Sequence, residues 1–191
     1  MTKMLYALLI AGIWITWVVY WYWIGRDTKP TLRRESRLSR ATHIVPLALA
    51  IMLMAAPAIW LGWLSTEIVA RTFTLYWVGV AILVVGLGFS IAARRYLGTN
   101  WSGTVTLKHG HELIRSGPYR FVRHPIYTGI LLGFVGSAIA IDEIRGVLAV
   151  GLVIVAFLVK IRLEERWMIE IFGDAYHRYR AEVRALLPYV L

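Results

Sequence analysis

Five long apolar stretches dominate this sequence and restrict how it can fold. About 20 apolar residues are needed to cross the roughly 30 Å hydrocarbon core of a bilayer. Of the 191 residues, 59% are hydrophobic and only 17% are charged, which is far more apolar than an average soluble domain. We therefore predict an all-α integral membrane protein with five transmembrane helices, at Met4–Ile24, Ile44–Leu64, Phe73–Ala93, Ile126–Ile141 and Ile144–Ile161.

The basic residues are distributed unevenly between the connections. The segments 25–43, 94–125 and 160–191 carry six Lys or Arg residues each, and only three lie elsewhere. The positive-inside rule then places the N-terminus outside and the C-terminus in the cytoplasm. That membrane would be the plasma membrane of a prokaryote or the endoplasmic reticulum of a eukaryote.

The formal net charge of +10 arises from the same three segments. Cationic residues beside membrane spans meet anionic lipid headgroups, so we expect membrane lipids rather than nucleic acid as the partner of this charge. The basic stretch Arg26–Arg40 is interpreted as a connector lying along the lipid surface.

The sequence offers no pattern typical of a metal site. It contains no cysteine, which excludes disulfides, thiolate nucleophiles, iron–sulfur clusters and thiolate zinc sites. His109 and His111 alternate on a segment that looks extended, and His124 and His177 stand apart. We therefore expect no metal.

The segment from Gly117 to Gly129, GPYRFVRHPIYTG, places costly polar residues at the mouth of the fourth apolar stretch. Before it, TVTLKHGHELI alternates apolar and polar residues around Gly110, a pattern that predicts a short β-hairpin. Pro125 suits the first position of a helix. This layout would bring Tyr119, Arg123 and His124 to a helix N-terminus, which favours a negatively charged group.

Two features predict that the last two apolar stretches lie together. Only Asp142 and Glu143 separate them, so a tight helical hairpin is expected. Gly129, Gly133 and Gly136 form a small-residue face, and we expect that face to pack against the fifth stretch. Such packing would bring His124 close to the adjacent carboxylates Glu164 and Glu165.

The last segment, Asp174–Arg184, is predicted to be a short cytoplasmic helix lying across the membrane surface. Asp174 is the expected N-cap, and Tyr176, Tyr179 and Val183 share one face.

At this point the chain resembles a known family. The run HELIRSGPYRFVRHPIYTG, the EE pair and the run FGDAYHRYRAEVRALLPYV are together similar to the isoprenylcysteine carboxyl methyltransferase family and its prokaryotic relatives. The resemblance covers roughly residues 94–191, which we interpret as the methyltransferase region with two spans and the C-terminal helix. Residues 1–93, with three spans and the basic connector, match in general character only.

The resemblance implies an integral membrane enzyme that transfers a methyl group from S-adenosylmethionine. No G-x-G-x-x-G fingerprint of a Rossmann cofactor site is present. The cytoplasmic loop and the C-terminal helix would form the cofactor site instead. The implied cofactor contacts are His111, Glu112, Leu113, Ile114, Tyr119, His124, Pro125, Ile126, Tyr127 and Glu164.

The methyl acceptor is expected to be lipophilic or lipid-modified, and a carboxylate acceptor is favoured. In eukaryotic members an arginine four residues before the matched glutamate contacts the substrate; here that position is Lys160, with Arg162 two residues on. These two cations are the candidate catalytic residues.

Two alternatives stay open at this point. Phospholipid headgroup N-methyltransferases share similar motifs, and amine methylation would need a base such as Glu165, His124 or His111. Sterol reductases, which use NADPH, have a comparable C-terminal region.

Overall fold

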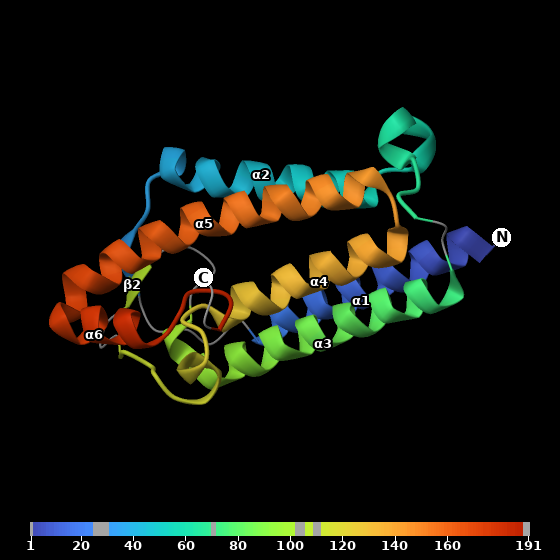
Figure 1. Ribbon diagram of the computed structural model, residues 1–191. Coiled ribbons are helices and arrows are strands. Elements are labelled where there is room, and N and C mark those ends of the chain that lie inside the picture. Colours follow the sequence, from blue (N-terminus) through green and yellow to red (C-terminus); the bar gives the residue numbers. More distant parts are fainter. Residues whose placement is uncertain (1, 25–30, 70–71, 102–105, 109–111, 189–191) are drawn as a thin grey trace.

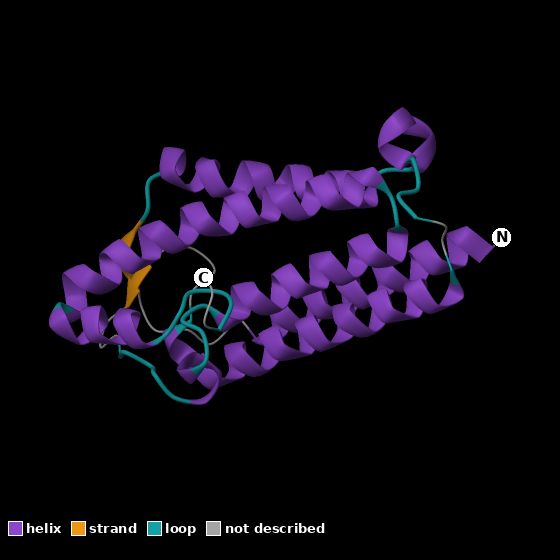
Figure 2. Ribbon diagram, viewed as in Figure 1, coloured by secondary structure: helices purple, strands orange, loops and turns teal. Residues whose placement is uncertain are grey.

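The computed structural model describes residues 2–24, 31–69, 72–101, 106–108 and 112–188. Within these residues the chain forms six α-helices, four short 3-10 helices and one two-stranded sheet (Figures 1 and 2). The elements in chain order are α1 (Thr2–Ile24), β1 (Thr31–Arg34), α2 (Arg37–Ala55), η1 (Ala58–Trp60), η2 (Gly62–Ser65), α3 (Phe73–Leu97), η3 (Gly98–Asn100), β2 (Thr106–Lys108), η4 (Gly117–Arg120), α4 (Pro125–Ile141), α5 (Ile144–Phe172) and α6 (Asp174–Glu182).

The long helices form two layers. One layer contains α2 and α5, which run side by side, and the other contains α1, α3 and α4 (Figure 1). Two hydrophobic clusters hold the layers: one joins α2, α4 and α5 around Val153 and Phe157, and the other joins α1, α3 and α4 around Tyr76 and Leu83. The N-terminus lies at one end of the layers, whereas the loops before α4 and after α6 lie at the other end (Figure 1).

The length and composition of the helices fit an integral membrane protein. Four of them, α1, α2, α3 and α5, are long and apolar enough to cross a bilayer, and α4 is apolar but shorter. In α1 only 6% of the apolar window is buried inside the protein, the smallest share among these four helices. The indoles of Trp14 and Trp17 fasten α1 to the other helices by donating to Ser137 Oγ (3.0 Å) and Ser90 Oγ (2.9 Å).

The small-residue face of α4 packs against α3, which corrects the prediction that it would meet the fifth stretch. A Cβ placed on Gly136 would lie 2.4 Å from the backbone nitrogen of Leu83, and one on Gly129 would lie 2.5 Å from the carbonyl oxygen of Gly86. Gly79 and Gly86 of α3 make the matching approach from the other side. Glycine on both helices therefore allows backbone-to-backbone contact, which explains the choice of partner.

The second helix is displaced toward the N-terminus relative to the predicted stretch Ile44–Leu64. It begins at Arg37, where Ser36 caps it by accepting from the backbone N–H of Ser39 (3.1 Å), and it ends at Ala55. Ala56, which precedes Pro57, has an extended backbone (ψ 141°), as is favoured for a residue before proline, and short 3-10 turns complete the segment. Half of the supposed basic connector is therefore helical or paired in the sheet.

The strand signal in TVTLKHGHELI is correct, but the predicted local hairpin is wrong. Thr106–Lys108 pairs antiparallel with Thr31–Arg34, a segment far away in the sequence. Gly110, the expected turn residue, lies outside the described residues. The small sheet thus ties the first basic connection to the loop that precedes the candidate site.

The short connection between α4 and α5 is confirmed. Asp142 ends α4 in the left-handed conformation (φ 52°, ψ 47°) and α5 begins at Ile144. From the first turn of α5, Arg145 pairs with Glu143 (2.7 Å) and donates to the carbonyl oxygens of Leu53 (3.3 Å) and Ala56. Arg145 therefore satisfies free carbonyl groups at the end of α2.

Helix α5 is longer than the predicted stretch Ile144–Ile161. Its 29 residues extend over about 43 Å at 1.5 Å per residue, which exceeds the roughly 30 Å hydrocarbon core of a bilayer. Glu164 and Glu165 lie in the part of α5 beyond Ile161.

Candidate active site

The loop before α4 is fastened to the chain that follows α6. The backbone N–H groups of Arg123 and His124 donate to the carbonyl oxygens of Arg184 (2.8 Å) and Ala185 (3.0 Å). One turn into α4, Thr128 Oγ1 donates to the carbonyl oxygen of Leu186 (2.7 Å). The C-terminal segment thereby fixes the position from which His124 starts the helix, as the N-cap residue with Pro125 in the first turn.

Glu165 lies at the centre of a buried ionic cluster. Arg123 Nε donates to its Oε1 (2.8 Å), and Arg123 Nη2 forms an ion pair with the same oxygen (2.7 Å). Both side chains are less than a tenth exposed. The guanidinium of Arg180, on α6, contacts the other carboxylate oxygen at 3.3 Å, and His124 Nε2 lies 3.3 Å from Oε1. The remaining donors of Arg123 reach the carbonyl oxygens of Arg180 (3.2 Å) and Val183. This cluster joins the loop before α4, the N-cap of α4, α5 and α6.

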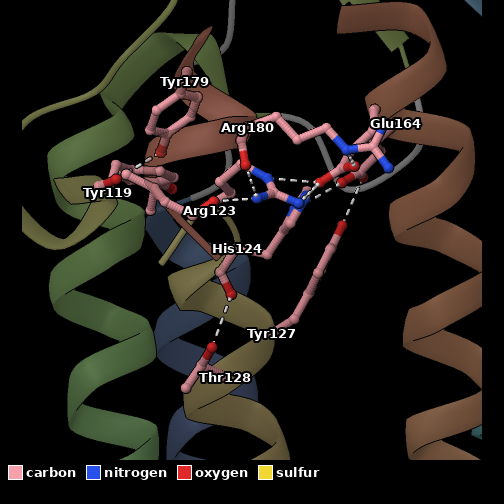
Figure 3. A network of polar contacts seen from close by, with 10 residues as sticks. Tyr119, Arg123, His124, Tyr127, Thr128, Glu164, Tyr179 and Arg180 are labelled. Atoms are coloured by element: carbon pink, nitrogen blue, oxygen red, sulfur yellow. Dashed lines mark hydrogen bonds and ion pairs between the residues drawn. The ribbon is translucent and has the colours of Figure 1, made fainter. Parts of the chain in front are cut away.

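Glu164 faces different partners. The hydroxyl of Tyr127 donates to its Oε1 (2.6 Å), and His124 Nδ1 lies 3.6 Å from its Oε2 (Figure 3). His124 therefore stands between the two glutamates, with one ring nitrogen toward each. The Glu164 side chain is 21% exposed, whereas that of Glu165 is 7% exposed, so Glu164 is the more accessible carboxylate.

Three stacked rings form a wall beside these carboxylates. His124 stacks on Tyr127 with ring centroids 5.5 Å apart, and Tyr127 stacks on Phe157 at 4.9 Å. The ammonium of Lys160 lies 5.3 Å from the centre of the Tyr127 ring, within range of a cation–π interaction. One aromatic ring thus contacts both Glu164 and Lys160.

Two further tyrosines close the site from the α6 side. The hydroxyl of Tyr179 donates to the carbonyl oxygen of Tyr119 (2.6 Å), which links η4 to α6. Burial raises the pKa of the Tyr179 phenol to about 12 and also raises the pKa of the Tyr119 phenol. Both phenols therefore stay neutral at physiological pH, and that of Tyr179 acts as a hydrogen-bond donor.

A cavity of about 1350 Å³ opens beside this wall. It continues between the two helix layers, along Trp14, Leu47 and Phe134, as far as Arg145 near the opposite end. Its volume exceeds that of most small-molecule pockets, and its lining is mainly apolar with a few polar groups, as in ligand sites. The polar residues that line its end beside the stacked rings are Glu112, Tyr119, Arg123, His124, Tyr127, Lys160 and Glu164.

The structure brings most of the sequence-predicted site residues to this cavity. Those that line it are Glu112, Ile114, Tyr119, His124, Ile126, Tyr127, Lys160 and Glu164. Their roles as cofactor or acceptor contacts stay predictions, because geometry alone does not identify a ligand.

Four predicted residues are placed elsewhere or lie outside the described chain. Leu113 and Pro125 do not line the cavity, although Pro125 is buried in the first turn of α4. Arg162 is exposed and also lies away from the lining, so Lys160 is the better-placed cation of the two. His111 falls outside the described residues.

Sequence reasoning missed several residues of this site. Arg180 was not expected to reach Glu165, and Phe157, Trp167 and Tyr176 line the cavity without having been predicted. A spacing signal existed for Phe157 and Trp167, because they lie seven residues before and three residues after Glu164 on the same helix and so share its face.

The predicted N-cap of α6 is wrong. Asp174 is the first residue of the helix, and Gly173 occupies the cap position with φ 48° and no side-chain cap. The reversal between α5 and α6 needs a positive φ at this point, which glycine adopts readily. Tyr176 and Tyr179 are both buried, but Val183, the third residue of the predicted face, lies at the C-cap with an extended backbone because α6 ends at Glu182.

Comparison with known proteins gives a consistent assignment. Residues 74–175, more than half of the chain, match the family described as phospholipid methyltransferase. This range includes the loop before α4 and both glutamates of α5.

The chain is similar to named methyltransferases. It is 24% identical over 186 residues to a protein-S-isoprenylcysteine O-methyltransferase of Dictyostelium discoideum, covering 96% of this chain and 77% of that protein. A protein of the same name from Schizosaccharomyces pombe is 29% identical over 114 residues, which cover 58% of this chain and 48% of that protein. Methanethiol S-methyltransferase 1 of Bradyrhizobium diazoefficiens is 38% identical over 71 residues, or 37% of this chain and 24% of that protein.

Proposed function

We propose a function from the premise that this chain belongs to the phospholipid methyltransferase family: it is an integral membrane methyltransferase that uses S-adenosylmethionine and methylates a carboxylate on a lipophilic acceptor. The relatives named as protein-S-isoprenylcysteine O-methyltransferases support an O-methyl product. The similarity to methyltransferases also argues against the sterol-reductase alternative. The observation that carries the proposal is the position of Glu164 and Lys160 on either side of Tyr127 at one end of the cavity.

The residues at this end fit the cofactor. The methionine part of S-adenosylmethionine carries an ammonium group, which the accessible carboxylate of Glu164 would bind by a charge-assisted hydrogen bond. Its carboxylate would lie near the N-terminus of α4, where the first backbone N–H groups have no partner within the helix. Tyr119 offers a ring to the sulfonium or the adenine, with Glu112, Ile114 and Ile126 also lining the cavity. The Tyr127 ring is already stacked on His124 and Phe157, so its contribution is the hydroxyl that binds Glu164.

The reaction needs little from the protein besides orientation. When bound, S-adenosylmethionine supplies a methyl group on a sulfonium, and an acceptor carboxylate oxygen takes that carbon as the carbon–sulfur bond breaks. A carboxylate is ionised at neutral pH, so no base has to remove a proton. Lys160 would hold the acceptor carboxylate beside the cofactor, and the apolar lining would exclude water from the reacting charges.

An amine or thiol acceptor would need a base, because its proton must be removed. Among the described residues, Glu165 is occupied by donors from Arg123, Arg180 and His124, which makes it a poor proton acceptor. The family name and the methanethiol methyltransferase keep phospholipid amines and thiols as the second candidates. Both predict that activity increases with pH, whereas the turnover of a carboxylate acceptor should not.

We also propose that α4 is a fifth span. Its 17 residues are at the lower limit for crossing a bilayer, and it packs along α3, which is long enough to cross. The N-terminus would then face outward and the site would face the cytoplasm. Single cysteines at Thr66 and Leu187, both exposed, test this with an impermeant thiol reagent on intact cells: labelling at 66 alone is expected, and labelling at 187 would contradict it.

The cofactor assignment is tested by Glu164→Gln. The amide keeps the size of the side chain but removes its charge, so the Kd for S-adenosylmethionine should rise at least about tenfold. Isothermal titration calorimetry of the detergent-purified protein measures it. Glu170→Gln, an exposed change on the same helix away from the cavity lining, serves as the matched control. An unchanged Kd in folded Glu164→Gln protein would remove Glu164 from the cofactor site.

A further inference from the structure

A second buried carboxylate lies close to the cavity, outside the motifs that carry the family resemblance. Glu35 precedes α2, and its Oε1 lies 3.5 Å from Nε2 of His43, two turns into the helix. The side chains of Glu35 and His43 are only 2% and 4% exposed. Ser39 Oγ donates to the other oxygen of Glu35 (3.2 Å). The pair is thus built into the start of α2.

One ring nitrogen of His43 is available for a further hydrogen bond. Its Nδ1 is buried and, within the part of the chain that the structure describes, has no hydrogen-bond partner. An unpartnered polar atom inside a membrane protein is costly, and such groups commonly mark a functional position. Histidine is also the side chain whose charge changes most readily near neutral pH.

Glu35 and His43 lie close to the end of the cavity that Lys160 lines, where the acceptor is proposed to bind. Helix α2 packs along α5, and Ile44 and Leu47, next to His43 and one turn beyond it, line the same cavity as Lys160. The charged groups that act on His43 are Glu35 and Arg40 from the α2 side, and Lys160 and Glu164 from α5. From α4, Tyr127 is within electrostatic range of both Glu35 and Glu164.

The charges around Lys160 nearly cancel before an acceptor arrives. Glu164 is assigned to the cofactor ammonium, and Arg40 is exposed, so that solvent screens its charge. The remaining charges that act on His43 are then the positive charge of Lys160 and the negative charge of Glu35. A carboxylate acceptor would add a second negative charge at this place. An uncompensated buried charge is strongly unfavourable, and protonation of His43 would restore neutrality.

We propose that Glu35 and His43 determine the charge of the acceptor that the site takes, with His43 binding a proton as an anionic acceptor binds beside Lys160. This inference rests on the proposed function, and it gives the two residues a role in specificity, without contact to the reacting atoms. The proposal also predicts that the KM for the acceptor depends on pH, whereas the turnover of the bound complex does not depend on pH.

Two amphiphiles with the same apolar tail and opposite charge test the inference. N-acetyl-S-farnesylcysteine carries a carboxylate that is ionised throughout pH 6 to 8, and S-farnesylcysteamine carries an ammonium. For the wild-type protein, the KM of the anionic probe should rise by up to about tenfold per pH unit, the limit for uptake of one proton. The cationic probe, tested as a competitor, should not weaken as the pH rises.

The two substitutions should act in opposite directions. His43→Gln cannot take up the proton, so the KM of the anionic probe should stay at its high, weak-binding value across the pH range. Glu35→Gln removes the opposing charge, so the KM should stay low across the same range. Simple damage to the start of α2 would raise KM in both variants, and that result would overturn the proposal. His177→Gln, an exposed change on α6, is the matched control and should keep the wild-type profile.

Proton uptake on acceptor binding can be measured on the wild-type protein, so this test does not depend on whether the variants fold. Titration of N-acetyl-S-farnesylcysteine in the presence of S-adenosylhomocysteine, which has no methyl group to donate, in two buffers of different ionisation enthalpy counts the protons bound. About one proton per acceptor is expected, and no proton uptake would overturn the inference. If Glu164→Gln leaves cofactor binding unchanged, the proposed function fails instead, and the two failures are thus distinguished.

Discussion

The two ends of the cavity carry buried ion pairs of the same kind with different surroundings. At one end Arg123 pairs with Glu165 at 2.7 Å, and at the other Arg145 pairs with Glu143 at 2.7 Å. Arg123 also binds the segment after α6, and its carboxylate partner is shared with His124. Arg145 also donates hydrogen bonds to carbonyl groups at the end of α2.

The difference shows what a buried ion pair contributes in each place. The cluster around Glu165 includes His124, whose other ring nitrogen faces Glu164. The ionic contacts therefore extend to an accessible carboxylate. Near Glu143, the network ends at a helix terminus. We infer that the first pair supports the cofactor site and that the second supports the fold.

The largest effect is expected for Arg123→Met. Removing the guanidinium breaks a buried ion pair from one side, which costs about 3–5 kcal/mol, and leaves Glu165 with the longer contacts to Arg180 and His124. It also removes the side-chain hydrogen bonds from the loop before α4 to the carbonyl oxygens of Arg180 and Val183. The free energy of unfolding should fall by that amount, and binding of S-adenosylmethionine should be lost. Thermal unfolding and calorimetry in detergent measure the two. Arg166→Met, an exposed change on α5, should alter neither.

Arg145→Met should separate stability from binding. The loss of stability should be similar, about 3–5 kcal/mol, because a buried ion pair is again broken from one side while Glu143 stays buried. The Kd for S-adenosylmethionine in the fraction that remains folded should be unchanged. A Kd that rises as strongly as in Arg123→Met would erase the distinction between the two ends.

A smaller loss of stability is expected for Gly136→Ala. The added Cβ would overlap backbone atoms of α3, which cannot move aside as a flexible side chain can, and overpacking of this kind costs about 1–3 kcal/mol. Gly151→Ala, on α5 with open space around it, should instead be neutral or raise the unfolding temperature slightly. Equal unfolding temperatures for the two variants would refute the close α3–α4 contact.

The smallest effect is expected for Lys160→Met. The KM of a carboxylate acceptor should rise about tenfold, as for one lost charge-assisted hydrogen bond, while cofactor affinity stays nearly constant. Arg162→Met, two residues away and exposed, should behave like the wild type. Steady-state kinetics give the KM of the acceptor and that of the cofactor. Full activity in the Lys160→Met, Arg162→Met double variant would show that neither cation holds the acceptor carboxylate.

The sequence predicted features that depend on local patterns. The short turn at Asp142 and Glu143 and the proline-led start of α4 follow from residue types at short range. His124 does lie beside the two glutamates, but the glycine face from which this was predicted packs against α3 and not against α5. The apolar stretches located the long helices because their length is set by bilayer thickness.

Features that depend on long-range contacts were predicted less well. The glycine face of α4 could pack against any helix with a complementary face, and the sequence does not say that Gly79 and Gly86 provide it. The pairing of Thr106–Lys108 with Thr31–Arg34 and the contact of Arg180 with Glu165 join segments that are far apart in the chain. Hydropathy also misplaced α2, because polar residues such as His43 lie inside the helix.

The central claim is that one cavity holds the methyl donor at Glu164 and a carboxylate acceptor at Lys160. The most direct measurement uses purified protein with methyl-labelled S-adenosylmethionine, N-acetyl-S-farnesylcysteine and phosphatidylethanolamine vesicles, followed by mass spectrometry. We predict label on the farnesylcysteine carboxylate as a methyl ester, released as methanol by mild alkali. Alkali-stable label on the phospholipid amine alone would contradict the account.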